Sequence, residues 1–503
     1  MGKKKSAGTL FNFSRRGFLK TGITGGVAAA VLPALTGARR PSNPSQPSFR
    51  VEPFDLEEMG ISEMQEGMNA GKYTSRSLVQ KYLDRIEAID RQGPALHSII
   101  ELNPDALDIA DALDKERKEK GARGPMHGIP VVIKDNIDTA DKMATTAGSL
   151  ALVGSKPPAD SFLVRQLRSA GAVIIGKTNL SEWANIRSSH STSGWSGRGG
   201  LTKNPYALDR NTSGSSSGTG SAVSANLCAA GVGTETDGSI VSPSSINGLV
   251  GIKPTVGLVS RTGVVPISHT QDTPGPMART VRDAAILLGA LTGVDPEDKA
   301  TAARKGKSLT DYTKFLDANG LQGARIGVAR FFFGFHEEVD VIMNKALEVL
   351  KQQGATVIDP VETKSFGQLG NAEELVLHYE LKADMNAYLA RLGPNAPVHT
   401  LKEIIEFNEK NRKTEMPYFG QDTFIKAEAR GPLTSKEYLA ALEKCRKLTR
   451  KEGIDAAMKK YKLDALLAPT DSPAWLTDLV DGDHFLGGSS TAAAVAGYPS
   501  ITV

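Results

Sequence analysis

Residues 128–136 read Gly128-Ile129-Pro130-Val131-Val132-Ile133-Lys134-Asp135-Asn136. The apolar run at 129–133 is rich in β-branched residues, which is typical of a strand that is buried on both faces of a sheet. Similar short runs at 172–175 and 249–252 are bounded by glycine or proline and alternate with helical stretches such as 161–169. This alternation predicts an α/β fold built on a largely buried sheet.

Helical patterns flank this core on both sides. Leu78, Tyr82, Ile86 and Ile89 recur at spacings of three and four, which predicts one face of a helix from about 77 to 90. The region after residue 300 is more charged and is predicted to cover the sheet with helices, one of which has an apolar face made by Val339, Ile342, Met343, Ala346, Leu347 and Leu350.

The composition is that of an ordinary globular protein. The 503 residues include 40% hydrophobic residues and only two cysteines, Cys228 and Cys445. These values exclude a disulfide scaffold, a collagen-like chain and a disordered tail, and a chain of this length can bury a large core without covalent cross-links. A disulfide between the two cysteines is possible in principle, but no sequence pattern supports it.

The first 38 residues look like a targeting segment. Ser14-Arg15-Arg16-Gly17-Phe18-Leu19-Lys20 is the twin-arginine pattern, a weakly apolar stretch follows at 21–35, and small residues at 36–38 offer a cleavage site. An uncleaved membrane anchor is the alternative. A membrane-spanning helix needs about 20 apolar residues, however, and this stretch is shorter and is interrupted by glycine. We therefore expect export to the periplasm or the medium through the twin-arginine machinery, with no stable membrane association after cleavage.

The positive charge of the chain is concentrated in that segment. The formal net charge is +4, and the segment contributes six cations and no acid: Lys3, Lys4, Lys5, Arg15, Arg16 and Lys20. The remainder, with a net charge of −2, has no electrostatic feature that favours nucleic acid or anionic lipid. No nucleic-acid partner is expected.

Two motifs resemble catalytic signatures only in their letters. Gly171 to Thr178 matches the phosphate-binding pattern G-x-x-x-x-G-K-[ST], but the intervening Ala-Val-Ile-Ile is a strand sequence rather than a loop that cradles phosphate. Gly214 to Gly218 matches the nucleophile elbow G-x-S-x-G, but residues 209–213 before it are polar and do not form the apolar strand that an elbow needs. The eight histidines show no metal-binding spacing, so no metal is expected.

A third region, Ser213 to Pro276, is the stronger candidate for chemistry. It contains a Gly/Ser-rich loop at 213–220 and a second serine-bearing segment, the glycine-bounded turn at 233–240 that includes Ser239. A flexible linker is the ordinary interpretation of a Gly/Ser-rich loop, but it fits poorly between apolar α/β segments. Consecutive N–H groups in a glycine-bounded turn such as 233–240 can point at one spot, as an oxyanion hole requires.

These motifs together resemble the amidase signature family. The likeness runs from about residue 55 to the end of the chain and rests on four ordered motifs: residues 128–136, 214–218, 234–240 and 272–279. Within the family, Glu182-Trp183-Ala184-Asn185 and Ser193-Gly194-Trp195-Ser196 are similar to the exported peptide amidases.

The resemblance implies a fold, a site and an activity. The fold would be a large twisted mixed β-sheet surrounded by α-helices, and the site a Ser–Ser–Lys triad with Ser239 as nucleophile, Ser215 as bridging serine and Lys134 as base. Ser216 is the alternative bridging serine. The family also implies that the peptide bond before Ser215 is cis. The implied activity is hydrolysis of a linear carboxamide to carboxylate and ammonia, with no cofactor.

The chemistry can also be argued from the residues. A serine hydroxyl needs a base, and no histidine lies in these motifs. A lysine becomes a base when burial lowers its pKa from about 10.4, and the apolar neighbours of Lys134 would bury it. The oxyanion would be bound by the backbone N–H groups of Thr236, Asp237, Gly238 and Ser239.

One departure from the family pattern concerns charge. The common Gly-Gly-Ser-Ile-Arg is replaced by Asp237-Gly238-Ser239-Ile240-Val241, which adds an acid and removes an arginine beside the pocket. The substrate is therefore not inferred from other members. The alternatives to an amidase are a catalytically silent amide-binding relative and a glutaminase-type subunit of an amidotransferase. The second of these works beside cytosolic partners, which the export segment disfavours.

The domain organisation follows from these observations. Residues 39–54 are predicted as a linker and 55–503 as the amidase domain, with N-terminal helices at 55–127, a catalytic α/β core at 128–300, a helical cover at 300–450 and returning strands at 455–503. The sequence stops within an apolar strand pattern at 497–503, which is an unusual end for a core strand. The C-terminal end is therefore expected to be truncated and the returning strands incomplete.

Overall fold

The structure is a computed structural model that describes residues 51–303, 305–362 and 365–503. The predicted twin-arginine segment at 1–38 and the predicted linker as far as residue 50 lie outside the described residues. Within the described part of the chain, no helix combines the length and the apolar character needed to cross a membrane.

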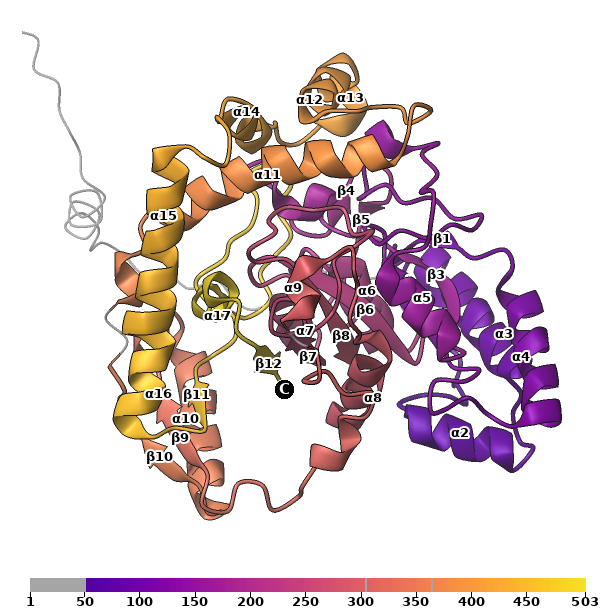
Figure 1. Ribbon diagram of the computed structural model, residues 1–503. Coiled ribbons are helices and arrows are strands. Elements are labelled where there is room, and N and C mark those ends of the chain that lie inside the picture. The colour runs from indigo at the N-terminus through magenta and orange to yellow at the C-terminus, as the bar shows by residue number, and fades with distance from the viewer. Residues whose placement is uncertain (1–50, 304, 363–364) are drawn as a thin grey trace, which may run out of the picture. The chain divides into compact units, whose positions relative to one another are not determined.

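A seven-stranded mixed sheet forms the centre of the fold (Figure 1). Its strand order is β1-β3-β2-β6-β8-β7-β12; β2 is parallel to β3 and β6, and the other neighbours are antiparallel. The strands are β1 (Ile99–Leu102), β2 (Pro130–Lys134), β3 (Val173–Thr178), β6 (Ala230–Glu235), β7 (Val250–Lys253), β8 (Thr273–Ala278) and β12 (Ser500–Thr502). The mixed sheet and the three strands expected from apolar runs are confirmed.

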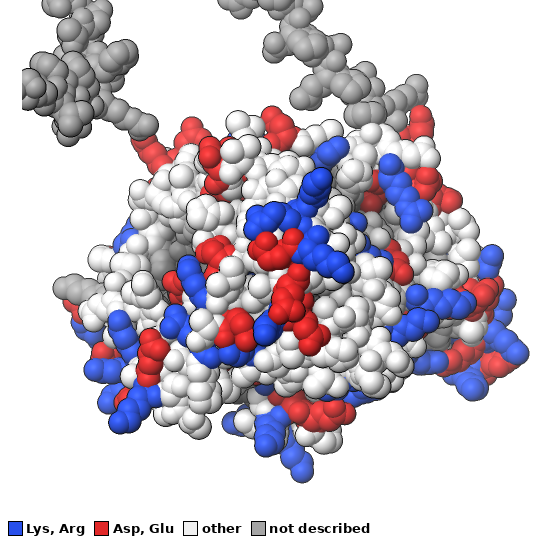
Figure 2. Space-filling model, turned by 90° about the horizontal axis from the view of Figure 1, so that it is seen from above, with Lys and Arg blue, Asp and Glu red and all other residues white. Residues whose placement is uncertain are grey.

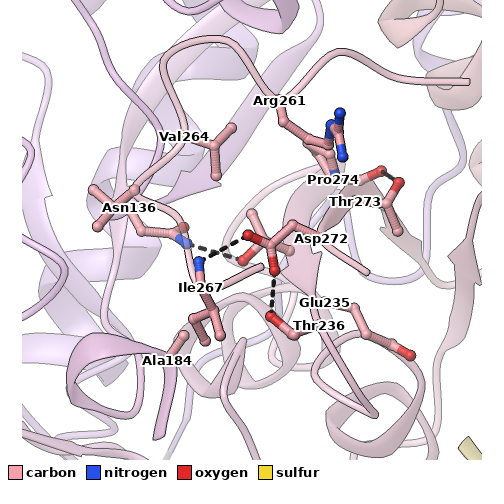
Figure 3. Close-up of a pocket in the computed structure, with 12 residues that line it drawn as sticks. Asn136, Ala184, Glu235, Thr236, Arg261, Val264, Ile267, Asp272, Thr273 and Pro274 are labelled. Atoms are coloured by element: carbon pink, nitrogen blue, oxygen red, sulfur yellow. Dashed lines mark hydrogen bonds between the residues drawn. The ribbon is translucent and has the colours of Figure 1, made fainter. Parts of the chain in front are cut away.

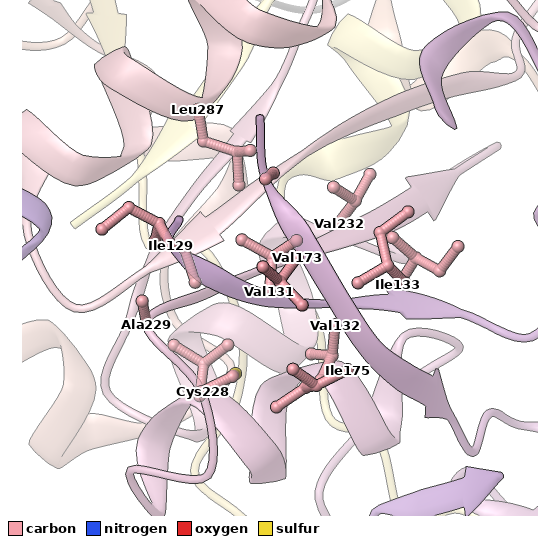
Figure 4. Close-up of a cluster of buried hydrophobic side chains, with 14 of the residues drawn as sticks. Ile129, Val131, Val132, Ile133, Val173, Ile175, Cys228, Ala229, Val232 and Leu287 are labelled. Carbon is pink, nitrogen blue, oxygen red and sulfur yellow. The ribbon is translucent and has the colours of Figure 1, made fainter. Parts of the chain in front are cut away.

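Helices cover this sheet because their apolar stripes need burial. Helix α5 (Phe162–Ser169) begins at Ser161, whose hydroxyl accepts a hydrogen bond from the Val164 N–H at 3.3 Å, and it buries Leu163, Val164 and Leu167. Figure 4 shows the same principle at the centre, where Leu287 of α8 (Val281–Leu291) packs in one apolar cluster with Ile129 and with Val131 of β2. Both cysteines are buried and free, so no disulfide joins them.

Further helices precede, separate and follow these strands. The N-terminal group is α2 (Ile61–Asn69), α3 (Ser75–Arg85) with a wider π-helical continuation (Ile86–Arg91), and α4 (Ala106–Lys120). Between and after the central strands lie α6 (Ser217–Ser224), α7 (Val241–Ile246), α9 (Lys299–Ala302), α16 (Asp455–Tyr461) and α17 (Ser490–Ala496). The helix expected at about 77–90 is present as α3 and its continuation.

A small second sheet changes the interpretation of one helix. Strands β10 (Thr356–Ile358), β9 (Arg325–Val328) and β11 (Ala465–Leu467) pair in parallel in that order, and α10 (Glu337–Gln352) packs against β10. Only Leu347 of the expected apolar face is fully buried, and Ile342 is 63% exposed. The prediction that Ile342 lines a buried face is wrong, because a three-stranded sheet covers a narrower stripe than the central sheet would.

A layer of helices after residue 370 packs on the side of the core that carries Trp183. Figure 1 shows the long helix α11 (Ala372–Arg391) with α12 (Leu401–Lys410), α13 (Arg412–Glu415) and α14 (Asp422–Glu428) beside it; α15 (Lys436–Arg446) packs against α11. Their shared core includes Leu381, Leu389 and Phe424, and Phe424 meets the Trp183 ring edge-on at 5.8 Å between centroids. A short ribbon of β4 (Trp195–Ser196) and β5 (Gly200–Leu201) lies in the loop after Trp183.

A buried charge cluster joins this helical layer to the core. The Arg187 guanidinium donates to Glu182 Oε1 at 2.7 Å, approaches Glu415 Oε2 at 4.0 Å and stacks over Phe419, and all three charged side chains are fully buried. Burial raises the pKa of Glu182 well above its usual range, while Arg187 opposes that shift.

Arg187→Met is expected to destabilise the fold by about 3 kcal/mol, because it leaves two buried carboxyl groups without their cation. Urea unfolding followed by circular dichroism measures the change. Arg165→Met on the exposed face of α5 is the control, with an expected change of at most about 0.5 kcal/mol. Equal effects of the two substitutions would show that the cluster does not stabilise the fold.

Candidate active site

Lys134 is the last residue of β2, and its side chain meets Thr234 near the end of the neighbouring parallel strand β6. Its Nζ donates to Ser215 Oγ at 2.7 Å, to the Thr234 carbonyl at 3.2 Å and to Thr234 Oγ1 at 3.0 Å. The side chain is completely buried. Burial lowers the pKa of Lys134 to about 7, although the nearby Glu235 and Asp272 carboxylates oppose that shift. A substantial fraction of this amine is therefore neutral near pH 7.

Ser215 is presented to Lys134 by an unusual loop. The Gly214–Ser215 peptide bond is cis, as the family resemblance implied. Ser215 is fully buried, and its carbonyl accepts from the Ser181 N–H at 3.1 Å. A Cβ atom at position 214 would lie 2.2 Å from Ser181 Oγ, so a larger residue before this serine would have to displace the Ser181 hydroxyl.

Ser216, the alternative bridging serine, has a different set of partners. Its hydroxyl donates to the Thr234 carbonyl at 3.1 Å and accepts from the Thr234 N–H at 3.2 Å, which ties it to β6. Only Ser215 of the two shares a hydrogen bond with Lys134 within the described residues. The contact with Lys134 therefore favours Ser215 as the bridging group.

Ser239 lies in the turn that joins β6 to α7. The turn has Gly238 at a φ of 80°, and Glu235 closes it by accepting from the N–H groups of Ile240 and Val241 at 2.8 and 3.0 Å. The Ser239 carbonyl accepts from the Ser216 N–H at 3.2 Å, so the two serine-bearing segments are adjacent. Ser239 is 8% exposed, and its hydroxyl makes no hydrogen bond to any described residue, Ser215 included.

The backbone of this turn offers unpaired donors. We call residues 236–239 the oxyanion turn. None of the N–H groups of Thr236, Asp237, Gly238 and Ser239 donates to another atom among the residues that the structure describes. Unpaired N–H groups in a half-buried turn beside a serine can bind a developing negative charge.

A small cleft lies beside Thr236 of the oxyanion turn (Figure 3). It holds about 250 Å³ of space, part of it open to solvent, and Asn136, Thr234, Thr236 and Asp272 are among its lining residues. Asn136 Nδ2 donates to Thr234 Oγ1 at 3.0 Å, and Thr236 Oγ1 donates to Asp272 Oδ1 at 2.6 Å. Burial raises the pKa of Asp272 to about 6. Thr234, whose hydroxyl accepts from Lys134, thus also lines this cleft.

The two misleading motifs have ordinary structural roles. The G-x-x-x-x-G-K-T run enters β3 at Val173, and its Lys177 is buried, donating to the Ile137 carbonyl at 2.6 Å and to Thr145 Oγ1 at 2.8 Å. The residues before Gly214 form no named strand, so the run 214–218 is not a strand-to-helix elbow. Both interpretations from the sequence are confirmed.

One histidine lies near two acids, but these acids already have partners. His269 contacts Asp384 at 2.9 Å and Glu380 at 3.5 Å, and Glu380 also accepts from the Tyr438 hydroxyl at 2.7 Å and the Thr270 N–H at 3.2 Å. The group ties a loop before β8 to α11 rather than presenting free ligands.

On the face seen in Figure 2, acidic and basic side chains are interspersed.

The sequence did not identify two residues that shape this site. Thr234 belongs to the motif at 234–240 and is the residue before the last one of β6. Nothing in the sequence around it indicates that its hydroxyl accepts a hydrogen bond from Lys134. Glu235 closes the oxyanion turn, and an acid shortly before a helix start could have suggested that role.

The fold and the site define a class of α/β enzyme in which a buried lysine meets a serine on a cis peptide, next to a turn with free N–H groups. A family model described as Amidase matches residues 77–500, and the chain belongs to the amidase signature family. It is a hydrolase that acts on carbon–nitrogen bonds of amides.

Known proteins of the same family show how close the likeness is. The solved structure of native peptide amidase from Stenotrophomonas maltophilia is 49% identical, with a TM-score of 0.85 over 90% of this chain and 91% of that one. A probable amidase from Arabidopsis thaliana is 42% identical over 90% of this chain and 84% of its own. The glutamyl-tRNA(Gln) amidotransferase of Halorhodospira halophila contains a chain that is 35% identical, with 83% of each chain covered.

Proposed function

We propose that this enzyme hydrolyses linear carboxamides, either small amides or the C-terminal amides of peptides, to carboxylate and ammonia. The single observation that carries the proposal is the 2.7 Å hydrogen bond between the buried Lys134 Nζ and Ser215 Oγ. The likeness to a peptide amidase supports the peptide-amide class.

In the proposed mechanism Ser239 is the nucleophile. Neutral Lys134 takes the proton of Ser215 while Ser215 takes the proton of Ser239, and Ser239 Oγ forms a bond to the amide carbon. The former carbonyl oxygen becomes negative and is bound by the free N–H groups of the oxyanion turn, each worth about 3 kcal/mol of the barrier. The relay needs the Ser239 hydroxyl to reach Ser215, and the bond between Ser216 N and Ser239 O keeps their segments together.

The second half of the reaction returns every proton. The proton held by Lys134 passes back through Ser215 to the amide nitrogen, the carbon–nitrogen bond breaks, and ammonia leaves. Water then loses a proton by the same route, attacks the acyl-enzyme and releases the carboxylate with the Ser239 hydroxyl restored. No group beyond these side chains and backbone N–H groups takes part in the proposed steps.

The test is ammonia release by the purified full chain from three substrate types: a small acyl amide, an amidated dipeptide and L-glutamine. We expect the first two to release ammonia and L-glutamine to be at least about tenfold slower, a difference of about 1.4 kcal/mol in the barrier. Fastest release from L-glutamine would favour the glutaminase alternative. A folded protein that releases no ammonia from any of the three would favour the silent relative.

A further inference from the structure

Two acidic side chains from distant segments meet at the oxyanion turn. Asp237 lies within the turn, and Glu373 is the second residue of α11; both are partly buried. Their carboxyl groups lie close enough for Asp237 to disfavour ionisation of Glu373. Asp237 Oδ1 is buried and has no donor among the described residues. Two ionised carboxylates this close repel each other, so their proximity favours one proton held by the pair.

Further hydrogen bonds fix both acids in place. Asp237 Oδ2 accepts from Thr491 Oγ1 of α17 at 2.7 Å. Glu373 Oε1 accepts from Gln271 Nε2 at 2.9 Å, and the same amide group donates to the Thr236 carbonyl at 3.3 Å. Thr236 of the oxyanion turn is thus linked to Glu373 through Gln271, and the neighbouring Asp237 lies beside Glu373.

We infer that Glu373 is a positioning residue, which holds the oxyanion turn in its catalytic shape through a single proton shared with Asp237. The inference rests on the proposed function, because the turn matters only if it binds an oxyanion. Removing the proton would place two negative charges side by side and push α11 away from the turn.

Burial and the nearby Asp237 raise the pKa of Glu373 well above its usual range, which favours the protonated form of Glu373. Other titratable groups also face the pair. From β6 and β7 these are Glu235 and Lys253, and burial lowers the pKa of Lys253 to about 8. From α15 it is Cys445, whose thiol has a pKa raised to about 12 by burial. Because Lys253 titrates in the alkaline range too, the test changes Glu373 alone.

The experiment compares Glu373→Gln, Glu373→Ala and the control Glu374→Gln, whose side chain is exposed. The readouts are kcat and KM from pH 6 to 10 with the best amide of the panel. We expect the kcat of wild type to fall at alkaline pH, where the pair loses its proton. In Glu373→Gln the side-chain amide can donate to Asp237 and accept from Gln271. We therefore expect its kcat near pH 7 to lie within about threefold of wild type and this alkaline decline of kcat to be absent. Glu373→Ala should lower kcat about tenfold with KM within about twofold, the effect of one lost hydrogen bond.

Hydrogen exchange measured by mass spectrometry over residues 236–244 gives a readout that does not need activity. We expect faster exchange in Glu373→Ala than in wild type and no change in Glu373→Gln at neutral pH. If Glu373→Ala does not fold, Glu373→Gln is compared with wild type between pH 7 and 10. Hydrogen exchange over residues 236–244 should then become faster with rising pH in wild type and not in Glu373→Gln.

The inference is overturned if Glu373→Ala behaves like Glu374→Gln in both readouts, or if Glu373→Gln keeps the alkaline decline of wild type and the same exchange at every pH. Failure of the proposed function looks different. Wild type would then release no ammonia from any amide, while the exchange measurement would still report whether Glu373 holds the turn.

Discussion

Ser239→Ala is expected to lower kcat for ammonia release by at least about 10⁴-fold and to leave KM within about threefold. The substitution removes the oxygen that forms the acyl-enzyme, and no other hydroxyl occupies its place in the turn. The backbone N–H groups of residues 236–239 stay in place, so the substrate should still bind. A coupled assay for ammonia, run under single-turnover conditions, measures the loss.

The matched control is Ser244→Ala on α7, five residues further on. The Ser244 hydroxyl is buried and has no hydrogen-bond partner among the described residues, so its removal should leave kcat within about twofold. Mass spectrometry of the rapidly quenched wild-type reaction should find the acyl group on the peptide that contains Ser239. An active Ser239→Ala enzyme, or an acyl group on the peptide that contains Ser215, would refute the assignment of the nucleophile.

Much of the central sheet could be predicted because its strands are buried on both faces. Ile129 to Ile133 must be apolar throughout, so the run stands out in the sequence, and the same holds for the run that begins β3. The false phosphate-binding motif was recognisable for the same reason. Helix α10 was misjudged at Ile342 because its partner is a sheet assembled from strands as far apart as Arg325 and Ala465. Such pairings leave no local signal.

The residues of the candidate site also differ in whether a local sequence pattern reveals them. Lys134, Ser215 and Ser239 lie in short motifs whose residue types already suggest the chemistry. Glu373 lies in a helix with no motif, more than a hundred residues from the oxyanion turn, and only the folded chain links it to that turn through Gln271. The acid at position 237, a departure from the family pattern, thus has a partner that sequence patterns could not reveal.

Lys134→Met is expected to lower kcat by about 10³-fold, the contribution of a general base. Methionine is unbranched like lysine and one heavy atom shorter, so most of the buried space stays filled. Lys134→Arg should be equally inactive, because a guanidinium keeps its charge at any pH used and cannot accept the proton of Ser215. The control is Lys177→Met, which removes another fully buried lysine that contacts neither Ser215 nor Ser239. Circular dichroism melting of all three variants separates loss of activity from loss of folding.

The pH dependence gives the sharper test of the base. Since the pKa of Lys134 is lowered to about 7, the neutral amine becomes the major form above that value, and wild-type kcat should rise as the pH increases through about 7. The same lowered pKa means that the unfolded chain binds more protons than the folded chain between about pH 7 and 10.4, so this lysine reduces stability as the pH falls through that interval. Lys134→Met should lose both the rise in kcat and this part of the stability change, whereas Lys177→Met should keep the rise in kcat. If the rise near pH 7 persists in Lys134→Met, another group supplies the base, and the role assigned to the contact between Lys134 and Ser215 is wrong.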